Sequence, residues 1–146
     1  MEEIWKPIDG YEGLYEISTF GRVKSLVDCH GIKRDKIVKP LHSRYGYLLV
    51  NLYKNKQLKS ARIHHLVAIA FIPDHLNLPY INHKDEEKTN NFVGNLEWCT
   101  ALYNNRYGTA TARAIDTRSI PIEQVTLDGK VVAVYRSTRI ADELLG

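Results

Sequence analysis

The chain is poor in cysteine and has no long apolar run, and each absence excludes a class of protein. Its 146 residues include two cysteines, Cys29 and Cys99, which lie seventy positions apart. That spacing supplies neither a disulfide framework nor a paired-cysteine zinc knuckle, so we expect a protein of the reducing cytoplasm. No apolar stretch reaches the ~18–20 residues of a membrane span, and the N-terminus lacks the basic flank of a signal peptide. We therefore expect no membrane association.

Acidic residues are scarce in one part of the chain. The formal net charge is +3, but residues 20–60, the basic segment, contain ten basic and two acidic side chains. Residues 61–110 and 111–146 are each close to neutral. This distribution indicates a polyanion such as nucleic acid as the partner, and the alternative is a lysine-rich solvated face that protects strand edges. We predict phosphate contacts from Arg22, Lys24, Lys33, Arg34, Lys36 and Arg44.

Short alternating runs in the first third of the chain indicate a small antiparallel sheet. Two of them flank the turn at residues 19–21, which is typical of a β-hairpin. Lysines at turns and at alternate strand positions leave one apolar face and one basic face, an arrangement that suits a sheet lying on a duplex. The expected strand segments are residues 15–18, 22–26, 37–38, 47–53 and 57–63.

The apolar period changes after residue 63. Residues 64–71 form a compact apolar stretch of good helix formers that Pro73 ends, which predicts a short buried helix. The next part of the chain reads as a strand, a very polar loop, a second strand, and a helix with Thr100 as its N-cap. The corresponding segments are residues 78–83, 84–91, 95–99 and 101–106.

The last forty residues read as a linker and a further small module. Residues 107–119 are small and polar without an apolar period, which is typical of a linker. We expect a β-hairpin turning at Asp128-Gly129 and then a helix over residues 139–145, capped by Ser137 or Thr138. The chain stops at Gly146, so we expect this last module to be partial. The predicted domains are residues 1–60, 61–106, 107–119 (linker) and 120–146.

The end of the first strand of residues 80–106 carries the residues with the clearest chemical potential. Asn82 and His83 end that strand, Asn95 opens the returning strand, and Asn104 lies one helical turn after Thr100. Hydrolysis of a phosphodiester needs oxygen ligands for a hard cation and a neutral imidazole that takes a proton from water. Asn82 and Asn104 as ligands around His83 meet these requirements. A histidine without partners is more often a structural residue, and the neighbouring asparagines distinguish this one.

Several stretches of the chain, taken in order, resemble the HNH homing endonucleases of phages and group I introns. These stretches are His64–Pro73, Ile81–Asp85, Lys88–Asn91 and Asn95–Thr100. The runs Trp5–Ser18 and Gly21–Leu26 are similar to the nuclease-associated modular domain that often precedes this core. The tail, Val125–Leu145, is similar to the start of a second such module. The resemblance covers nearly the whole chain in the family's order.

The resemblance implies a role for each of these site residues. His83 corresponds to the general base, and Asn82 and Asn104 correspond to ligands of one divalent ion, Mg²⁺ or Mn²⁺. Asn95 corresponds to the middle asparagine of the motif, which pins the loop between the strands. The implied activity is hydrolysis of phosphodiester bonds in duplex DNA, by a nick or a double-strand break, without a small organic cofactor. A phage-encoded protein would act in the cytoplasm of its bacterial host, as a monomer or a homodimer.

The implied fold is α+β. It has a small antiparallel β-sheet at the N-terminus, a ββα-metal (HNH) nuclease core, and a C-terminal β-hairpin with part of a helix. The strand, loop, strand and helix expected over residues 80–106 follow the order of the ββα-metal unit.

The chain departs from the family pattern before the general base. Many relatives have aspartate at this position, whereas this chain has Asn82. Two neutral ligands bind Mg²⁺ more weakly than a pair that includes a carboxylate. A bound phosphate could supply the missing charge, and so could Asp85, although a loop acid is more often a solvated turn residue.

Two other functions remain open on the sequence. A DNA-binding remnant with an inactive nuclease site would keep salt-sensitive binding without metal-dependent cleavage. A protein-interaction module would show neither property. His64 and His65 either support the nuclease core or begin a helix with their ring nitrogens satisfied by backbone groups.

Overall fold

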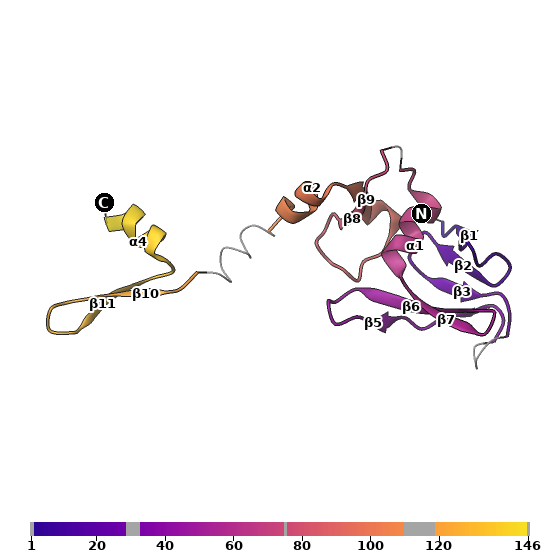
Figure 1. Cartoon of the computed structure of the whole chain (residues 1–146), viewed down its shortest axis with the longest axis horizontal. Helices are drawn as coiled ribbons and strands as arrows, with labels where there is room; N and C mark the ends of the chain where they lie inside the picture. Colours follow the sequence, from indigo (N-terminus) through magenta and orange to yellow (C-terminus); the bar gives the residue numbers. More distant parts are fainter. Residues whose placement is uncertain (1, 29–32, 75, 110–118, 146) are drawn as a thin grey trace. The chain divides into compact units, whose positions relative to one another are not determined.

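Antiparallel strands provide most of the secondary structure of this chain (Figure 1). The structure, a computed structural model, describes residues 2–28, 33–74, 76–109 and 119–145. Contacts divide the chain into unit 1, Met1–Asn104, and unit 2, Asn105–Gly146. Most of the expected linker, residues 107–119, lies outside the described residues, as does Cys29. The α+β class is confirmed.

The first sheet of unit 1 has four short strands in the order β1-β2-β3-β4. The predicted hairpin is its centre, and the turn between β2 and β3 places Gly21 at φ 74°, in the left-handed region that favours glycine. The sequence did not predict β1, because lysine and proline fill two of its three positions. The strands are β1 (Trp5–Pro7), β2 (Tyr15–Ser18), β3 (Val23–Ser25) and β4 (Lys36–Ile37).

A second sheet of three strands follows, in the order β5-β6-β7. Its strands are β5 (Leu41–His42), β6 (Leu48–Lys54) and β7 (Gln57–Arg62). Asn55 and Lys56 join β6 to β7 with φ angles of 51° and 62°, the left-handed pair of a tight hairpin turn. The single N-terminal sheet that we expected is therefore two sheets, since β4 and β5 do not pair and the chain changes sheet between them.

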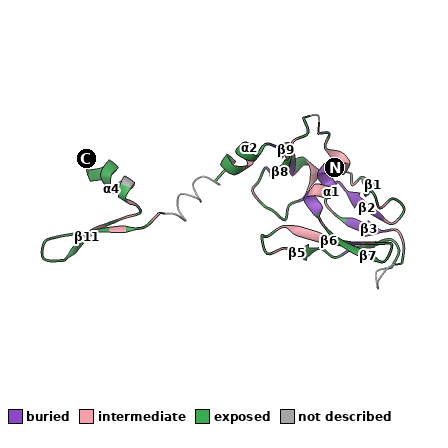
Figure 2. Ribbon diagram, viewed as in Figure 1, coloured by how far each residue is buried: buried purple, intermediate pink, exposed green. Residues whose placement is uncertain are grey.

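Helix α1 (Ile63–Phe71) contacts strands of both sheets and of the β8–β9 pair. It buries Ile63, His64, Val67 and Ala68, which recur at helical spacing on one side, and Pro73 follows its end. Figure 2 shows buried residues on α1 and on the strands beside it. One core thus joins residues on both sides of the expected boundary at 60/61, which falls within β7. The core cluster comprises Ile8, Tyr15, Ile17, Val23, Val38, Val50, Leu52, Ile63, Val67, Ala68, Ile81 and Leu96.

The expected order of strand, loop, strand and helix over residues 80–106 is confirmed. Strand β8 pairs with β9 in antiparallel register, with Asn82 opposite Glu97 and His83 opposite Leu96. Asn95, expected to begin the returning strand, instead ends the 3₁₀ turn that precedes it, because the chain turns tightly from Phe92 before it extends. The elements are β8 (Tyr80–His83), η1 (Val93–Asn95), β9 (Leu96–Cys99) and α2 (Ala101–Arg106).

Unit 2 contains the expected hairpin and helix. Strands β10 (Ile122–Val125) and β11 (Val131–Tyr135) pair in antiparallel register around a turn with Gly129 at φ 84°. Helix α4 (Thr138–Leu145) begins after Ser137, whose hydroxyl accepts from the Ile140 amide at 3.4 Å. Ser137 is therefore the cap. Within the described residues, every helix is too short or too polar to cross a membrane.

Candidate active site

The end of strand β8 places two polar side chains in the interior of unit 1. Asn82 and His83 are 6% and 5% exposed, and as neighbours on a strand they point to opposite faces. Burial of an amide and an imidazole is costly unless their polar atoms are hydrogen-bonded, so their partners define the site.

His83 is held by Asn91 from the loop that follows β8. Its Nε2 lies 3.3 Å from Oδ1 of Asn91, whose own Nδ2 donates to the Thr89 carbonyl at 3.2 Å. The second bond fixes the orientation of the amide, so Nε2 of His83 donates and Nδ1 keeps its lone pair. Burial lowers the pKa of His83, more than its bond to Asn91 and the nearby acids raise it. The imidazole is therefore neutral near pH 7 and can accept a proton at Nδ1.

Asn95 ties the two ends of the polar loop together. Its Nδ2 donates to Oδ1 of Asp85 at 2.8 Å and to the Asn90 carbonyl at 2.9 Å, while its Oδ1 accepts from the Asp85 amide at 3.1 Å. All three bonds span five to ten residues and lie within the β8–β9 loop, residues 84–95. The side chain thus contributes to the shape of the loop, and its part in catalysis stays a prediction.

The carboxylate of Asp85 accepts hydrogen bonds within the β8–β9 loop. One carboxylate oxygen accepts from Asn95 and from the Glu87 amide at 2.9 Å, and the other accepts from Nδ2 of Asn90 at 2.6 Å. The bond from Asn90 is the main reason that the pKa of Asp85 lies below its ordinary value. With both oxygens hydrogen-bonded within the loop, Asp85 is a turn residue.

Asn82 shares a carboxylate with a residue of α2. Its Nδ2 donates to Oε1 of Glu97 at 2.8 Å, and the hydroxyl of Tyr103 donates to the same oxygen at 3.1 Å. Asn104, half-buried, follows Tyr103 on α2, so this contact anchors the helix that carries it beside the β8–β9 pair. The sequence alone did not single out Glu97, although antiparallel pairing of the two expected strands could have indicated that it lies opposite Asn82.

The residues around Asn82 fit a hard divalent cation. Because Glu97 binds the amide nitrogen, the carbonyl oxygen of Asn82 is the atom left to ligate, and amide oxygens are suitable ligands for Mg²⁺. A carboxylate in contact with this amide adds the negative charge that such an ion favours. Among the described residues, no three His, Cys, Asp or Glu side chains group as a metal site. The amide oxygen of Asn82 and the neighbouring Glu97 carboxylate are the oxygen atoms that β8 and β9 bring together here.

His64 on α1 packs against the general-base candidate. The ring centroids of His64 and His83 are 5.1 Å apart in an edge-to-face arrangement, and His64 also lies 4.9 Å from the ring of Tyr47. Burial, followed by the charges of its neighbours, lowers the pKa of His64 to about 3. Its Nδ1 is buried and has no hydrogen-bond partner among the residues that the structure describes. The possibility that backbone groups satisfy the helix-start histidine is thus wrong for this atom of His64.

Two cations that the sequence did not single out surround Tyr47. Arg62 lies 5.6 Å and Lys88 5.0 Å from the centre of its ring, and Nζ of Lys88 donates to the Tyr45 carbonyl at 3.0 Å. Arg62 comes from β7 and Lys88 from the β8–β9 loop, so the fold brings cations from separate parts of the chain to the ring of Tyr47. Of the two, Lys88 places positive charge near His83.

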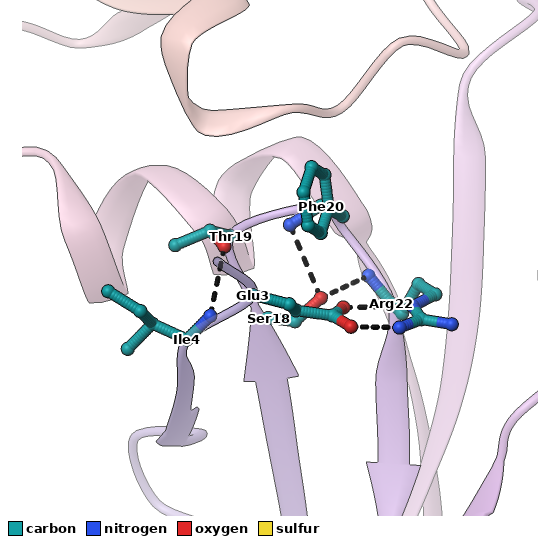
Figure 3. Close-up of polar contacts among 6 residues, drawn as sticks. All are labelled: Glu3, Ile4, Ser18, Thr19, Phe20 and Arg22. Carbon is teal, nitrogen blue, oxygen red and sulfur yellow. Dashed lines mark hydrogen bonds and ion pairs between the residues drawn. The ribbon is translucent and has the colours of Figure 1, made fainter. Parts of the chain in front are cut away.

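The six predicted phosphate-binding residues differ in their surroundings. Arg22 pairs with Glu3, as Figure 3 shows, and Lys24 pairs with Glu16 at 2.8 Å. Lys33 and Lys36 line a shallow cavity of about 430 Å³ together with Lys39. Arg44 lies over the ring of Tyr45 at 4.5 Å, and the backbone amide of Arg34 donates to Asp28. Two of the six cations are therefore already neutralised by acids, and DNA contact by any of them stays a prediction.

The turn between β2 and β3 supports the β8–β9 loop. The Val93 amide donates to the Thr19 carbonyl at 2.8 Å, and the rings of Phe20 and Phe92 stack with centroids 5.6 Å apart. A Cβ atom at Gly21 would lie 2.7 Å from Cβ of Asn91, the partner of His83. The loop that holds the imidazole is thus packed on the N-terminal hairpin.

Known proteins resemble this chain over nearly all its length. The NUMOD4 motif matches residues 3–53. The DNA endonuclease I-HmuI of Bacillus phage SP01 is 34% identical over 97% of this chain and 83% of that protein. An uncharacterized HNH endonuclease of Acanthamoeba polyphaga mimivirus is 36% identical over 90% of this chain, which spans 38% of that relative. A solved structure of DNA binding and cleavage by the HNH homing endonuclease I-HmuI matches with a TM-score of 0.60 and 35% identity, over 100% of this chain and 84% of that one.

Proposed function

This chain belongs to the HNH homing endonuclease family, and we propose that it hydrolyses phosphodiester bonds in duplex DNA with one bound divalent ion, Mg²⁺ or Mn²⁺. The observation that carries the proposal is the buried pair Asn82-His83, with a neutral imidazole held by Asn91 on one face and an amide held by Glu97 on the other. This arrangement supports a base and a metal ligand on adjacent residues.

His83 acts as the general base. The bond from Nε2 to Asn91 leaves Nδ1 to take a proton from the water that attacks the phosphorus. Because the ring is buried and neutral, it is ready for this step at physiological pH. Asn91 fixes the ring and Asn95 fixes the loop that carries Asn91, so both act through geometry.

Asn82 and Asn104 are the residues that would hold the metal ion through their side-chain oxygens. When bound, a divalent ion stabilises the negative charge that builds on the phosphate and on the departing 3′ oxygen. Two observations support this assignment: the oxygen of Asn82 has no hydrogen bond within the described part of the chain, and the Glu97 carboxylate is its neighbour. Each chain would contribute one such centre, so a monomer would nick duplex DNA and a homodimer would cut both strands.

Duplex DNA is the proposed partner because cations are concentrated before the nuclease residues. Lys33 and Lys36 around a shallow cavity, and Lys88 and Arg62 over the ring of Tyr47, offer charge to the phosphate backbone. Since one relative is a phage protein, we place the reaction in the cytoplasm of a bacterial host.

Plasmid cleavage tests the proposal directly. The purified chain is expected to convert supercoiled plasmid to nicked or linear DNA with Mg²⁺ or Mn²⁺, and not with EDTA. His83→Ala is expected to lower the rate by roughly 10²–10⁴-fold, the contribution typical of a general base. His42→Ala, which changes an exposed histidine on β5, is the matched control and should cut like the parent. Intact plasmid with both metals, or a His83→Ala variant as active as the parent, would refute the proposal.

A DNA-binding remnant is the second candidate function, and the neutral side chain of Asn82 favours it. Such a protein would retard a labelled duplex in a salt-sensitive manner and leave plasmid intact. Asn82→Asp separates the two functions. An inert parent that begins to nick after this substitution supports the remnant, whereas an active parent excludes it.

A further inference from the structure

Glu97 lies at the centre of a polar contact that links strand β8, strand β9 and helix α2. It stands directly opposite Asn82 in the strand register, so both side chains lie on the same face of the pair. Both hydrogen bonds to it, from Asn82 at 2.8 Å and from Tyr103 at 3.1 Å, end on Oε1. Its second oxygen, Oε2, makes no hydrogen bond or ion pair within the described part of the chain.

The bond from Asn82 determines which atom of that amide can meet a metal ion. An asparagine side chain offers one oxygen ligand, and its nitrogen cannot ligate. Because a carboxylate accepts only, Glu97 selects the orientation in which Nδ2 faces Glu97 and Oδ1 faces away from it. Without this carboxylate, nothing that Asn82 contacts among the described residues would fix the orientation of its amide.

Glu97 also differs from the other acids near the site in the residues that its carboxylate contacts. The carboxylate of Asp85 accepts three bonds within the β8–β9 loop, and Glu87 binds Thr89 in the same loop. Glu97 alone among these three acids contacts a proposed ligand. A pair of neutral amide ligands lacks the charge that a hard divalent cation favours, and a carboxylate in contact with one of them supplies it.

We propose that Glu97 is the positioning residue of the metal site, which turns the oxygen of Asn82 toward the ion and supplies the negative charge that Asn82 lacks. The inference rests on the proposed function, because it takes Asn82 as a ligand. Tyr103 assists by holding the same oxygen of Glu97 from α2, one residue before Asn104. The carboxylate acts through Asn82 and need not touch the ion.

Binding of Mn²⁺ alone to the full chain, followed by electron paramagnetic resonance without DNA, measures the site apart from its activity. Glu97→Gln keeps an oxygen acceptor for Asn82 and removes the charge, whereas Glu97→Ala removes both. We expect Mn²⁺ affinity to fall about 10-fold in Glu97→Gln and toward about 100-fold in Glu97→Ala, the range for residues that orient metal ligands. Glu2→Gln removes an exposed carboxylate near the N-terminus and should bind Mn²⁺ like the parent. Parent affinity in either Glu97 variant overturns the proposal.

An exchange of the two side chains separates a metal role from a structural one. In the double variant Asn82→Asp with Glu97→Gln, the hydrogen bond is kept with its donor and acceptor reversed, and the net charge is unchanged. The carboxylate then lies at the ligand position, so we expect Mn²⁺ affinity at least equal to that of the parent. If Asn82 and Glu97 only stabilise the two strands, the parent and the double variant should have the same thermal midpoint. The double variant should then also bind Mn²⁺ no more tightly than Glu97→Gln does. Failure of the exchange to restore Mn²⁺ binding in a folded protein overturns the proposal.

The outcome does not depend on cleavage. A parent that binds Mn²⁺ through Glu97 but leaves plasmid intact refutes the proposed function and keeps this inference. A parent that cuts DNA, while its Glu97 variants bind Mn²⁺ and cut at the parent's metal concentrations, refutes this inference alone.

Discussion

The β8–β9 loop, residues 84–95, and the stretch 33–44 of the basic segment are both polar, but they use polarity in opposite ways. In the loop, amides and carboxylates bind one another, as Asn95 does with Asp85 and Asn90. In the basic stretch, Lys33, Lys36 and Lys39 surround a shallow cavity. The role of the loop depends on the geometry of its hydrogen bonds, and the role of the basic stretch depends on its number of charges. Substitutions in the loop should therefore change stability and catalysis, and those in the basic stretch should change the salt dependence of DNA binding.

The largest loss of stability is expected from a substitution in the N-terminal hairpin, where it supports the β8–β9 loop. Gly21→Ala must hold alanine at φ 74° and place its Cβ 2.7 Å from Cβ of Asn91 and 3.1 Å from the Asn91 carbonyl oxygen. The conformation costs about 1–2 kcal/mol and the overpacking about 1–3 kcal/mol, so we expect unit 1 to lose about 2–5 kcal/mol of unfolding free energy. Urea unfolding measures the loss, and plasmid cleavage should fall as Asn91 moves away from His83.

Gly13→Ala is the matched control for that substitution. Gly13 has φ 73° in the same unit, but a Cβ there would meet nothing within 4 Å. It should therefore lose only the conformational part, about 1–2 kcal/mol, and keep the parent's cleavage rate. Equal losses in the two variants would mean that the hairpin does not constrain the loop.

The features of residues 80–106 that the sequence predicted correctly involve residues that are close together in the chain. The order of strand, loop, strand and helix follows from changes of apolar period within about thirty residues, and Asn95 meets its partners five to ten positions away. A spacing of that size is visible in a sequence, because a single turn or hairpin is enough to bring such residues together.

What the sequence could not predict depends on how separate elements pack. The pairing of Arg22 with Glu3 requires the chain to return past β1 and β2, and the contact of His64 with Tyr47 requires α1 to pack on β6. No periodicity carries that information. The single expected sheet became two for the same reason, since the alternation of apolar residues indicates strands without indicating which strands pair.

A second, smaller effect concerns the pH dependence of stability in the buried region. Burial lowers the pKa of His64 from 6.5 to about 3, so between these values the unfolded chain binds a proton that the folded chain does not. Stability from this residue is complete above pH 6.5 and is lost as the pH falls toward 3. Between pH 8 and pH 5 the loss should be about 2 kcal/mol.

Urea unfolding at pH 8, 6.5 and 5, for the parent and His64→Phe, measures this effect. The variant keeps a ring beside Tyr47 and lacks the titrating group, so its stability should fall by about 2 kcal/mol less than the parent's over this range. Burial also lowers the pKa values of His65 and His83, and those contributions remain in both proteins. The same pH dependence in parent and variant would show that His64 can take up its proton in the folded state.

The smallest effect on stability is expected in the basic stretch. Lys33→Ala and Lys36→Ala change exposed side chains outside the described ion pairs, so each should alter the unfolding free energy by less than about 0.5 kcal/mol. We expect these two substitutions to change DNA binding instead. If both lysines neutralise phosphates, the double variant should reduce the slope of log affinity against log salt by about 1.8, which is about 0.9 for each phosphate that is no longer neutralised.

Within the basic segment, Lys24→Ala tests whether pairing with an acid lowers the contribution of a lysine to DNA binding. Lys24 lies 2.8 Å from Glu16 and 4.6 Å from the centre of the Trp5 ring, so its charge is already paired in the free protein. Removal of the Lys24 side chain also leaves Glu16 without its cation, and the carboxylate of Glu16 then repels the DNA phosphates at the same place. We expect the salt slope to change less than half as much as in Lys36→Ala, measured by fluorescence anisotropy on one duplex between low and moderate salt. An equal change for the two lysines would mean that the count of charges, and not their pairing, sets how this surface holds DNA.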